Sequence, residues 1–321
     1  MPLFPANHRL IIVLSTTFMA LLGFPIISPA LPSVRTAFNL STQDVGLVMS
    51  SYAVPAMVCV PLFGVWADRY GKKLVLVPSL LLFSVAGGAC ALAPSPEMLY
   101  LLRFIQGIGA SALSSLNVAL VGDLYERTDR ARIMGYLGAT QNVGSGLLPL
   151  VGGALAAFAW FYPFLLPLVG LPVGLYLILH LHDAPGAPSR SGLDFLGYAR
   201  RHLLERRMLE LVFLTGGFIF IGFGAFVTYL PIFMKDNFAT AEFLIGFLMS
   251  ARAVSGTIVA SQFGRLTRRF SYRSLIFNAY IALAISMALI PWWKAIGSYL
   301  SPPCSMAGRL ACCAPRCRSW C

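Results

Sequence analysis

Charged side chains are scarce in this sequence. Only 11% of its 321 residues are Asp, Glu, Lys or Arg, whereas soluble domains carry roughly 25%. The hydrophobic fraction is 58%, and the mean hydropathy is +0.76. This composition excludes an ordinary soluble domain, because lipid is the only solvent for so much apolar surface.

Apolar/polar alternation is also missing, which excludes a transmembrane β-barrel. The apolar residues instead form continuous runs of about 20 residues, the length that a spanning helix needs. We therefore expect an all-α polytopic membrane protein. The predicted spanning segments are 10–30, 46–66, 74–94, 98–121, 133–156, 158–180, 209–231, 243–263 and 274–293.

The sequence lacks the motifs of the common enzyme classes. It contains no HExxH, no GxSxG and no phosphate-binding loop, so we predict that it is not an enzyme. It also lacks a soluble output domain, which a membrane sensor or scaffold would need. None of its twelve acidic residues lies in the middle of a predicted span. A proton-coupling acid would therefore lie at a helix end, lie in helices that are missing here, or not exist.

The basic residues lie mainly on one side of the predicted spans. With the N-terminus inside, sixteen of them face the cytoplasm and two, Arg35 and Lys235, lie in external loops. This asymmetry predicts a cytoplasmic N-terminus. The net charge of +12 then reports membrane orientation, and we expect no nucleic-acid partner. The sixteen are Arg9, Arg69, Lys72, Lys73, Arg127, Arg130, Arg132, Arg190, Arg200, Arg201, Arg206, Arg207, Arg265, Arg268, Arg269 and Arg273.

The chain repeats itself at an offset of 200 residues. VMSSYAVPAMVCVPLFG, which starts at Val48, aligns without a gap with LMSARAVSGTIVASQFG, which starts at Leu248. The repeat predicts a six-helix half over 1–182, a cytoplasmic linker with a short amphipathic helix over 183–207, and a partial second half over 208–294. Residues 295–321 hold five of the seven cysteines and no apolar run. We interpret this tail as the product of a shifted or truncated reading frame.

Three motifs resemble those of the major facilitator superfamily, and especially of its drug:proton antiporter-like branch. The first lies between segments 46–66 and 74–94, the second in 98–121 and the third in 133–156. In the third motif, Leu148 replaces the family's glycine before Pro149. The motif residues are Gly64, Asp68, Arg69, Gly71, Lys72 and Lys73; Arg103, Gln106, Gly107, Gly109 and Ala110; and Gly135, Gly144, Pro149, Gly152 and Gly153.

The resemblance implies a twelve-helix transporter, of which this sequence carries nine helices, and a role for each motif. Asp68 would bind the N-terminus of an eleventh helix, and Arg103 would help to couple protons to substrate movement. The glycines of segment 133–156 would form a seam with 243–263 that resists leak. Without the resemblance, Arg69, Lys72 and Lys73 are topology signals that face lipid phosphates, and the glycines are a packing seam of small residues.

Two intramembrane arginines are candidates for a cavity. Arg103, Gln106 and Asn117 share one helical face, and an arginine within a span costs about 2.5 kcal/mol or more unless it faces a cavity or a partner. Snorkelling to the external interface is the alternative for Arg103. Arg252 lies in the middle of segment 243–263 and aligns with Tyr52 in the repeat.

Together with the resemblance, these patterns predict a multi-pass transporter of the inner (cytoplasmic) membrane. We expect a monomer that exports small amphipathic molecules by alternating access, surrounded by the lipid bilayer. It would need no cofactor and would be driven by the proton gradient. The alternatives are a metabolite or sugar importer or facilitator, and an inactive truncated remnant.

Overall fold

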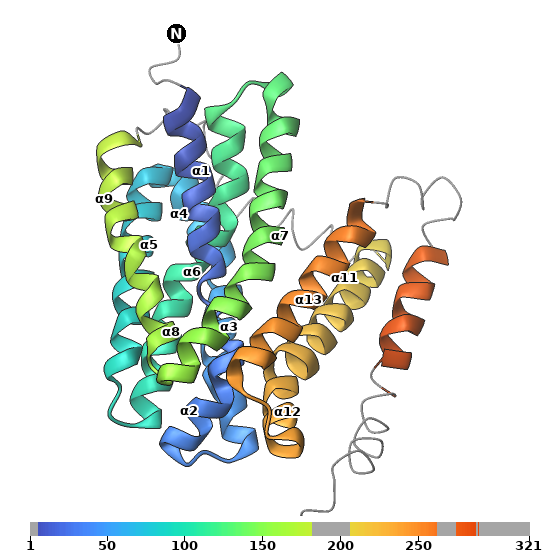
Figure 1. Ribbon diagram of the computed structural model, residues 1–321. Coiled ribbons are helices and arrows are strands. Elements are labelled where there is room, and N and C mark those ends of the chain that lie inside the picture. The colour runs from blue at the N-terminus through green and yellow to red at the C-terminus, as the bar shows by residue number, and fades with distance from the viewer. Residues whose placement is uncertain (1–5, 182–205, 262–273, 287, 289–321) are drawn as a thin grey trace, which may run out of the picture. The chain divides into compact units, whose positions relative to one another are not determined.

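The computed structural model describes residues 6–181, 206–261, 274–286 and 288, and these residues form helices and turns with no strand (Figure 1). By its internal contacts the chain divides into two units, Met1–Ser261 and Gln262–Cys321. The described part of the second unit contains the helix Ser274–Ser286. Most of the predicted linker and all of the cysteine-rich tail lie outside the described residues.

The helices of the first unit match most of the predicted segments. In chain order they are α1 Ala6–Leu21, η1 Ser28–Ala30, α2 Leu31–Phe38, α3 Thr42–Val58, α4 Val60–Tyr70, α5 Lys72–Ala89, η2 Cys90–Leu92, α6 Pro96–Leu124, α7 Arg127–Phe158, α8 Tyr162–Leu165, η3 Leu166–Val169, α9 Gly170–His180, α11 Arg206–Ile219, the π-helix η4 Phe220–Tyr229, α12 Leu230–Phe238 and α13 Glu242–Ser261.

The first predicted segment, 10–30, is not one helix. The α1 helix ends at Leu21, and a series of turns leads to η1. Pro25 has no N–H to donate to the Leu21 carbonyl, and a proline disfavours helical geometry at the residue before it. Pro29 and Pro32 fit because they lie in the first turns of η1 and α2, where no intrahelical donor is needed.

The second predicted segment, 46–66, is also broken. The α3 and α4 helices meet at Cys59 with a bend of 42°. Pro61 lies at the start of α4 and cannot donate to the Met57 carbonyl, so the helix changes direction there. By contrast, α7 continues through Pro149 as one helix of 32 residues.

Two short helices, α2 and α12, were not predicted. Each has a proline in its first turn, Pro32 in α2 and Pro231 in α12, and each ends at a residue in the left-handed conformation, Asn39 with φ 51° and Ala239 with φ 47°. These two residues are 200 apart, which is the offset of the sequence repeat. The structure therefore shows the repeat in backbone geometry as well as in residue identity.

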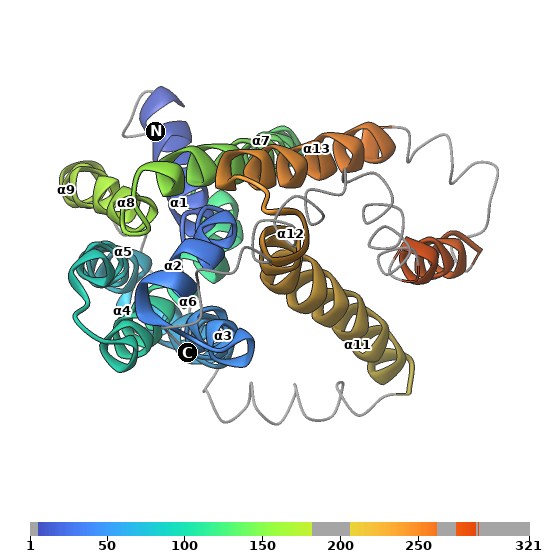
Figure 2. The same ribbon diagram turned by 60° about the horizontal axis from the view of Figure 1, so that its bottom comes forward.

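Residues 6–181 pack around α6. The α5 and α3 helices make its most extensive contacts, and α1 lies between α6 and α7. Figure 2 shows the same arrangement from another side. The buried core of this bundle is aliphatic and aromatic, with Leu76, Leu80, Phe83, Leu99 and Leu113 fully covered. The α13 helix, which belongs to the second copy of the repeat, packs along α7 of the first.

By length and composition, three of the described helices could cross a membrane: Lys72–Leu92, Pro96–Leu124 and Tyr162–His180. A fourth crossing results if the bent pair α3 and α4 forms one span. The described helices Ala6–Leu21 and Ser274–Ser286 are apolar but shorter.

Candidate functional site

The first motif forms the turn between α4 and α5. Gly71 has φ 97°, a conformation that L side chains rarely adopt, so glycine is required at this position. Lys72 donates from Nζ to the Ala119 carbonyl at 3.0 Å and forms an ion pair with Asp123, both on α6. Lys73 donates to the Ile178 carbonyl at 2.7 Å, on α9. The two lysines therefore connect three helices, in addition to any role in membrane topology.

The other members of this motif lie at the surface. Asp68 is exposed, and within the part of the chain that the structure describes no ion-pair partner approaches it. The Arg69 guanidinium lies 5.4 Å from the ring centroid of its neighbour Tyr70. A Cβ atom on Gly64 would meet nothing within 4 Å. The partner that the resemblance implies for Asp68 is therefore untested.

Arg103 is the largest fully buried side chain of the described residues. Its Nε donates to the Val48 carbonyl at 3.2 Å, and its Nη2 donates to the Gly23 carbonyl at 2.9 Å. Its Nη1 donates to Gln106 Oε1 at 2.7 Å, and its Cζ lies 4.4 Å from the centre of the Tyr52 ring. The guanidinium is therefore buried inside the first half, and snorkelling does not describe its position.

All these partners of Arg103 are neutral. Among the described residues no carboxylate forms a salt bridge with it, so the bundle holds a fixed positive charge. The Gly23 carbonyl is available because α1 ends two residues earlier. A Cβ atom on Gly23 would overlap the Tyr52 hydroxyl, so the break in the helix and Tyr52 together shape the place where the guanidinium lies. The sequence patterns did not predict this contact between Gly23 and Tyr52.

Two further polar atoms on this face of α6 lack hydrogen-bond partners in the described structure. They are Gln106 Nε2 and Asn117 Oδ1, and both residues are buried. An unpaired buried polar atom is costly, so these two atoms lower the stability of the bundle in this conformation. Arg103, Gln106 and Asn117 do share one face, as predicted, but in this conformation they are covered.

Glycines explain how closely α6 approaches its neighbours. A Cβ atom on Gly107 would clash with the Tyr52 backbone, and one on Gly109 would lie 2.6 Å from the Ser79 carbonyl oxygen. These contacts bring α3 and α5 to the backbone of α6, and they position the Arg103 side chain against Val48.

The glycines of α7 divide between two faces. Gly144 lies against Leu21, and Gly152 lies against the backbone of Ile26, both in or just after α1. Leu148 is buried and lies one helical turn from each of them, so it shares their face. The substitution of the family glycine by Leu148 therefore adds bulk toward α1.

The other face of α7 meets α13. A Cβ atom on Gly153 would lie 3.2 Å from the Gly246 Cα, and one on Gly246 would clash with the Pro149 carbonyl. Gly146 faces Ala253 at 3.7 Å, and Gly135 has open space around it. The seam between α7 and α13 therefore consists of Gly146, Pro149 and Gly153, and only part of the predicted glycine set belongs to it.

Arg252 lies on α13 and is exposed. Its Cζ lies 4.8 Å from the ring centroid of Phe226 in η4. The two intramembrane arginines therefore differ: Arg103 is buried among backbone carbonyls, and Arg252 packs over one aromatic ring.

These features describe a helical membrane protein built from repeated units. The sequence pattern of the Major Facilitator Superfamily matches residues 13–308. The chain belongs to this superfamily, whose members are transporters and not enzymes.

Curated relatives include exporters. Multidrug resistance protein 1 of Bacillus subtilis (strain 168) is 26% identical over 299 residues, which cover 92% of this chain and 75% of the relative. The bacillibactin exporter of the same strain is 26% identical, covering 89% of this chain and 74% of that protein. The quinolone resistance protein NorA of Staphylococcus aureus is 29% identical over 191 residues, covering 59% of this chain and 49% of NorA.

Solved structures show the same fold. A bacterial homolog to the human lysosomal transporter Spinster, inward-facing and unoccupied, has a TM-score of 0.68 at 19% identity, covering 84% of this chain and 64% of that chain. A D-xylose-proton symporter has a TM-score of 0.61 at 18% identity, covering 80% and 69%. The chain is thus an all-α polytopic membrane protein with the major facilitator fold, spanning about two thirds of the solved chains.

Proposed function

We propose that this protein is a secondary active transporter that exports small amphipathic molecules by proton-coupled alternating access. The observation that carries the proposal is the 26% identity to multidrug resistance protein 1 over 92% of this chain. The geometry supports it, because α7 and α13 come from different copies of the repeat and meet along a glycine seam. Seams of small residues allow close helix packing that can open and close.

We further propose that residues 1–182 and 208–294 form the two halves of a monomer in the inner (cytoplasmic) membrane, with the N-terminus in the cytoplasm. The distribution of basic residues supports this orientation. The end of the bundle that carries α2 and α12 then faces the outside, and the Lys72–Asp123 pair lies near the cytoplasm. Residues 183–207 form the linker between the halves, and residues 295–321 form a tail without a transport role.

Arg103 is our candidate for the residue that couples protons to transport. Its fixed charge changes the free energy of any proton or charged cargo that enters the first half. One observation favours the alternative of an importer or facilitator that needs no proton gradient: among the described residues no carboxylate pairs with Arg103. Dependence of transport on the proton gradient separates the two functions.

Efflux of ethidium, a lipophilic cation, from preloaded bacterial cells tests the proposal. Cells that express the 321-residue chain should lose the dye several-fold faster than cells with an empty vector, and a protonophore should abolish the difference. The Arg103→Gln variant should fall to the empty-vector rate. Arg132→Gln is the matched control, because Arg132 is exposed near the start of α7 and bonds to Tyr136 on its own helix.

The amount of each variant in the membrane must be equal for the comparison to hold. Efflux that survives the protonophore would contradict proton coupling and would favour the facilitator. Dye loss equal to the empty vector, with the protein present in the membrane, would contradict export of amphipathic cations and would indicate an inactive product.

A further inference from the structure

The α2 and α12 helices occupy matched positions in the two copies of the repeat. The Asn39 N–H donates to the carbonyls of Arg35 and Thr36, and the Ala239 N–H donates to those of Lys235 and Met234. Arg35 and Lys235 are thus 200 residues apart, and each lies one turn before a left-handed C-cap. The repeat has placed one cation on each helix at the same end of the molecule.

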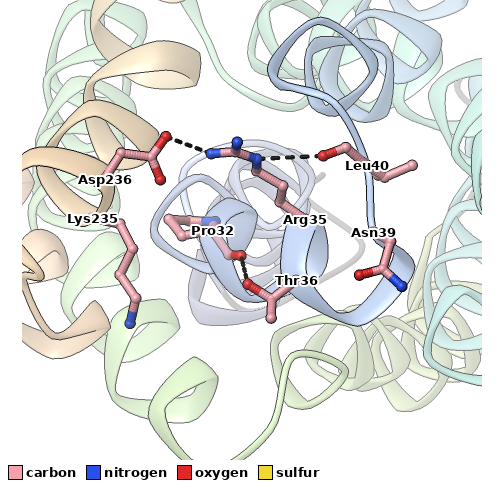
Figure 3. A pocket seen from close by; sticks show the side chains of 7 residues that line it. All are labelled: Pro32, Arg35, Thr36, Asn39, Leu40, Lys235 and Asp236. Atoms are coloured by element: carbon pink, nitrogen blue, oxygen red, sulfur yellow. Dashed lines mark hydrogen bonds and ion pairs between the residues drawn. The ribbon is translucent and has the colours of Figure 1, made fainter. Parts of the chain in front are cut away.

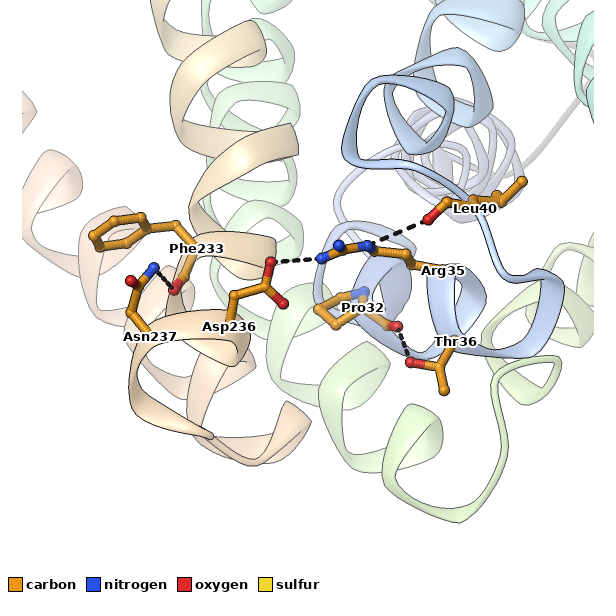
Figure 4. A network of polar contacts seen from close by, with 7 residues as sticks. All are labelled: Pro32, Arg35, Thr36, Leu40, Phe233, Asp236 and Asn237. Carbon is orange, nitrogen blue, oxygen red and sulfur yellow. Dashed lines mark hydrogen bonds and ion pairs between the residues drawn. The ribbon is translucent and has the colours of Figure 1, made fainter. Parts of the chain in front are cut away.

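The cation on α2 pairs with an acid on α12. Arg35 Nη1 donates to Asp236 Oδ2 at 2.5 Å, and Arg35 Nε donates to the Leu40 carbonyl at 3.4 Å (Figure 4). The bond to Leu40 holds the Nε side of the guanidinium at the end of α2, so the Nη1 side points toward α12. Both residues line a cavity of about 340 Å³ between α2 and α12, whose lining side chains are drawn in Figure 3.

The cation on α12 is joined to α2 through a second acid. Lys235 Nζ donates to Glu242 Oε1 at 2.8 Å, and the same oxygen accepts from Ser33 Oγ at 2.9 Å. Glu242 is the first residue of α13 and is largely buried, with 14% of its side chain exposed. The two positive charges of this cluster are therefore matched by two negative charges. The Arg35–Asp236 pair and the Ser33–Glu242 bond each join the first copy of the repeat to the second.

A third contact lies deeper at the same end. The Ser28 hydroxyl donates to the Val227 carbonyl and lies 3.5 Å from Met249 Sδ. Ser28 is fully buried. If the two copies separate at this end, the Arg35–Asp236 and Ser33–Glu242 bonds must break first, and water then reaches Ser28.

We propose that Ser33, Arg35, Lys235, Asp236 and Glu242 form a latch between the two copies, which we call the α2/α12 latch. It sets how often the protein opens at this end. The Arg35–Asp236 pair is partly exposed, with 29% and 48% of the side chains accessible, and such pairs are weak. The latch therefore biases a balance between two states and does not hold one permanently. Its external position and the opening motion that it controls rest on the proposed function.

Labelling of a cysteine behind the latch tests this role. In the full 321-residue chain carrying Ser28→Cys, a membrane-impermeant maleimide is added to intact cells. Mass spectrometry of the peptide that contains residue 28 gives the labelling rate without interference from native cysteines. Asp236→Asn and Glu242→Gln should each raise this rate by about 3- to 10-fold, which corresponds to roughly 0.7–1.4 kcal/mol in the closing equilibrium. The charge-swapped pair Arg35→Glu with Asp236→Arg should bring the rate back toward that of the intact latch.

Asp44→Asn is the matched control. Asp44 is an acid at the same end, but its carboxylate bonds to Ser41 within its own copy, so the labelling rate should not change. Unchanged rates for both Asp236→Asn and Glu242→Gln, or a swapped pair that labels as fast as Asp236→Asn, would overturn the latch. Labelling needs neither cargo nor gradient, so failure of transport leaves this test intact. Labelling only after permeabilisation would overturn the external orientation and retain the latch.

Discussion

The two copies of the repeat use the same sequence pattern to build helices of different shape. In the first copy, α3 and α4 are separated by a bend of 42° at Cys59. In the second, α13 continues helically past Val259, the position that corresponds to Cys59, to Ser261, where this described range ends. Pro55 and Pro61 of the first copy correspond to Ser255 and Ser261 of the second. The copies share the apolar pattern of a span, and the break at Cys59 occurs in the copy that carries Pro55 and Pro61.

The copies also differ in where they hold charge. Tyr52 of the first copy is buried and lies beneath the Arg103 guanidinium. At the corresponding position of the second copy, Arg252 is itself the cation and is exposed. A buried charge must have its hydrogen bonds satisfied locally. The first copy is therefore the more constrained of the two, and the second can tolerate more change.

The largest difference should appear when the two arginines are removed. Arg103→Ala removes the donor that Arg103 supplies to the Gly23 carbonyl and to Gln106 Oε1, and it opens a cavity, so we expect a loss of about 2–4 kcal/mol. Arg252→Ala removes one exposed contact with Phe226, and we expect a loss below about 1 kcal/mol. Thermal unfolding in detergent measures both; equal shifts in Tm would break the comparison between the copies.

A smaller difference should appear between the paired glycines Gly46 and Gly246. A methyl group on Gly246 would clash with the backbone carbonyl of Pro149, whereas one on Gly46 would lie 3.1 Å from the mobile end of Tyr229. We expect Gly246→Ala to lower stability by about 1–3 kcal/mol, and Gly46→Ala to cost much less because Tyr229 can rotate away. Thermal unfolding in detergent measures both losses of stability. A larger loss for Gly46→Ala than for Gly246→Ala would contradict the geometry of the α7/α13 seam.

Stability should also depend on pH through Glu242. Burial raises the pKa of this carboxyl, but hydrogen bonds from Lys235, its own backbone N–H and Ser33 outweigh burial and hold the pKa below its ordinary value of 4.5. Because the folded-state pKa is depressed, this stabilisation is complete above about pH 4.5 and is lost as the pH falls through the folded-state value. Unfolding measured from pH 6 downward should show this loss in the wild type and less of it in Glu242→Gln.

The smallest effect should come from the two left-handed caps. Asn tolerates this conformation better than Ala does, and the first copy has Asn39 where the second has Ala239. We expect Ala239→Asn to raise stability by about 0.5 kcal/mol and Asn39→Ala to lower it by a similar amount. A higher Tm for Ala239→Asn together with a lower Tm for Asn39→Ala would support the structural repeat. Tm shifts of the same sign in both variants would contradict it.

Apolar length predicts where the long helices lie, but the number of spans stays a prediction, because only three or four of the described helices are long and apolar enough to cross a membrane. The bounds of α5, α6 and α7 lie within a few residues of the segments predicted as 74–94, 98–121 and 133–156. The family and the fold were also predicted correctly, since the motif glycines and Arg103 are specific in type and spacing.

The sequence could not predict features that depend on contacts between residues far apart in the chain. The burial of Arg103 requires the carbonyl that the end of α1 releases at Gly23, 80 residues earlier. The ion pair of Lys72 with Asp123 joins the ends of two helices, and no local pattern indicates it. The short helices α2 and α12 lack a spanning length, so a search for apolar runs passes over them. The roles of the motif residues in transport stay predictions.

The Lys72–Asp123 pair has a consequence for the time course of synthesis. Lys72 leaves the ribosome 51 residues before Asp123, which is several seconds at about 5–20 residues per second. In the topology that we propose, Lys72 is therefore an unneutralised cation, of the kind that retains a loop in the cytoplasm, while the first spans enter the membrane. Its charge is paired only after α6 has been made. Under the proposed topology, one lysine thus acts first as an orientation signal and later as a bond between helices.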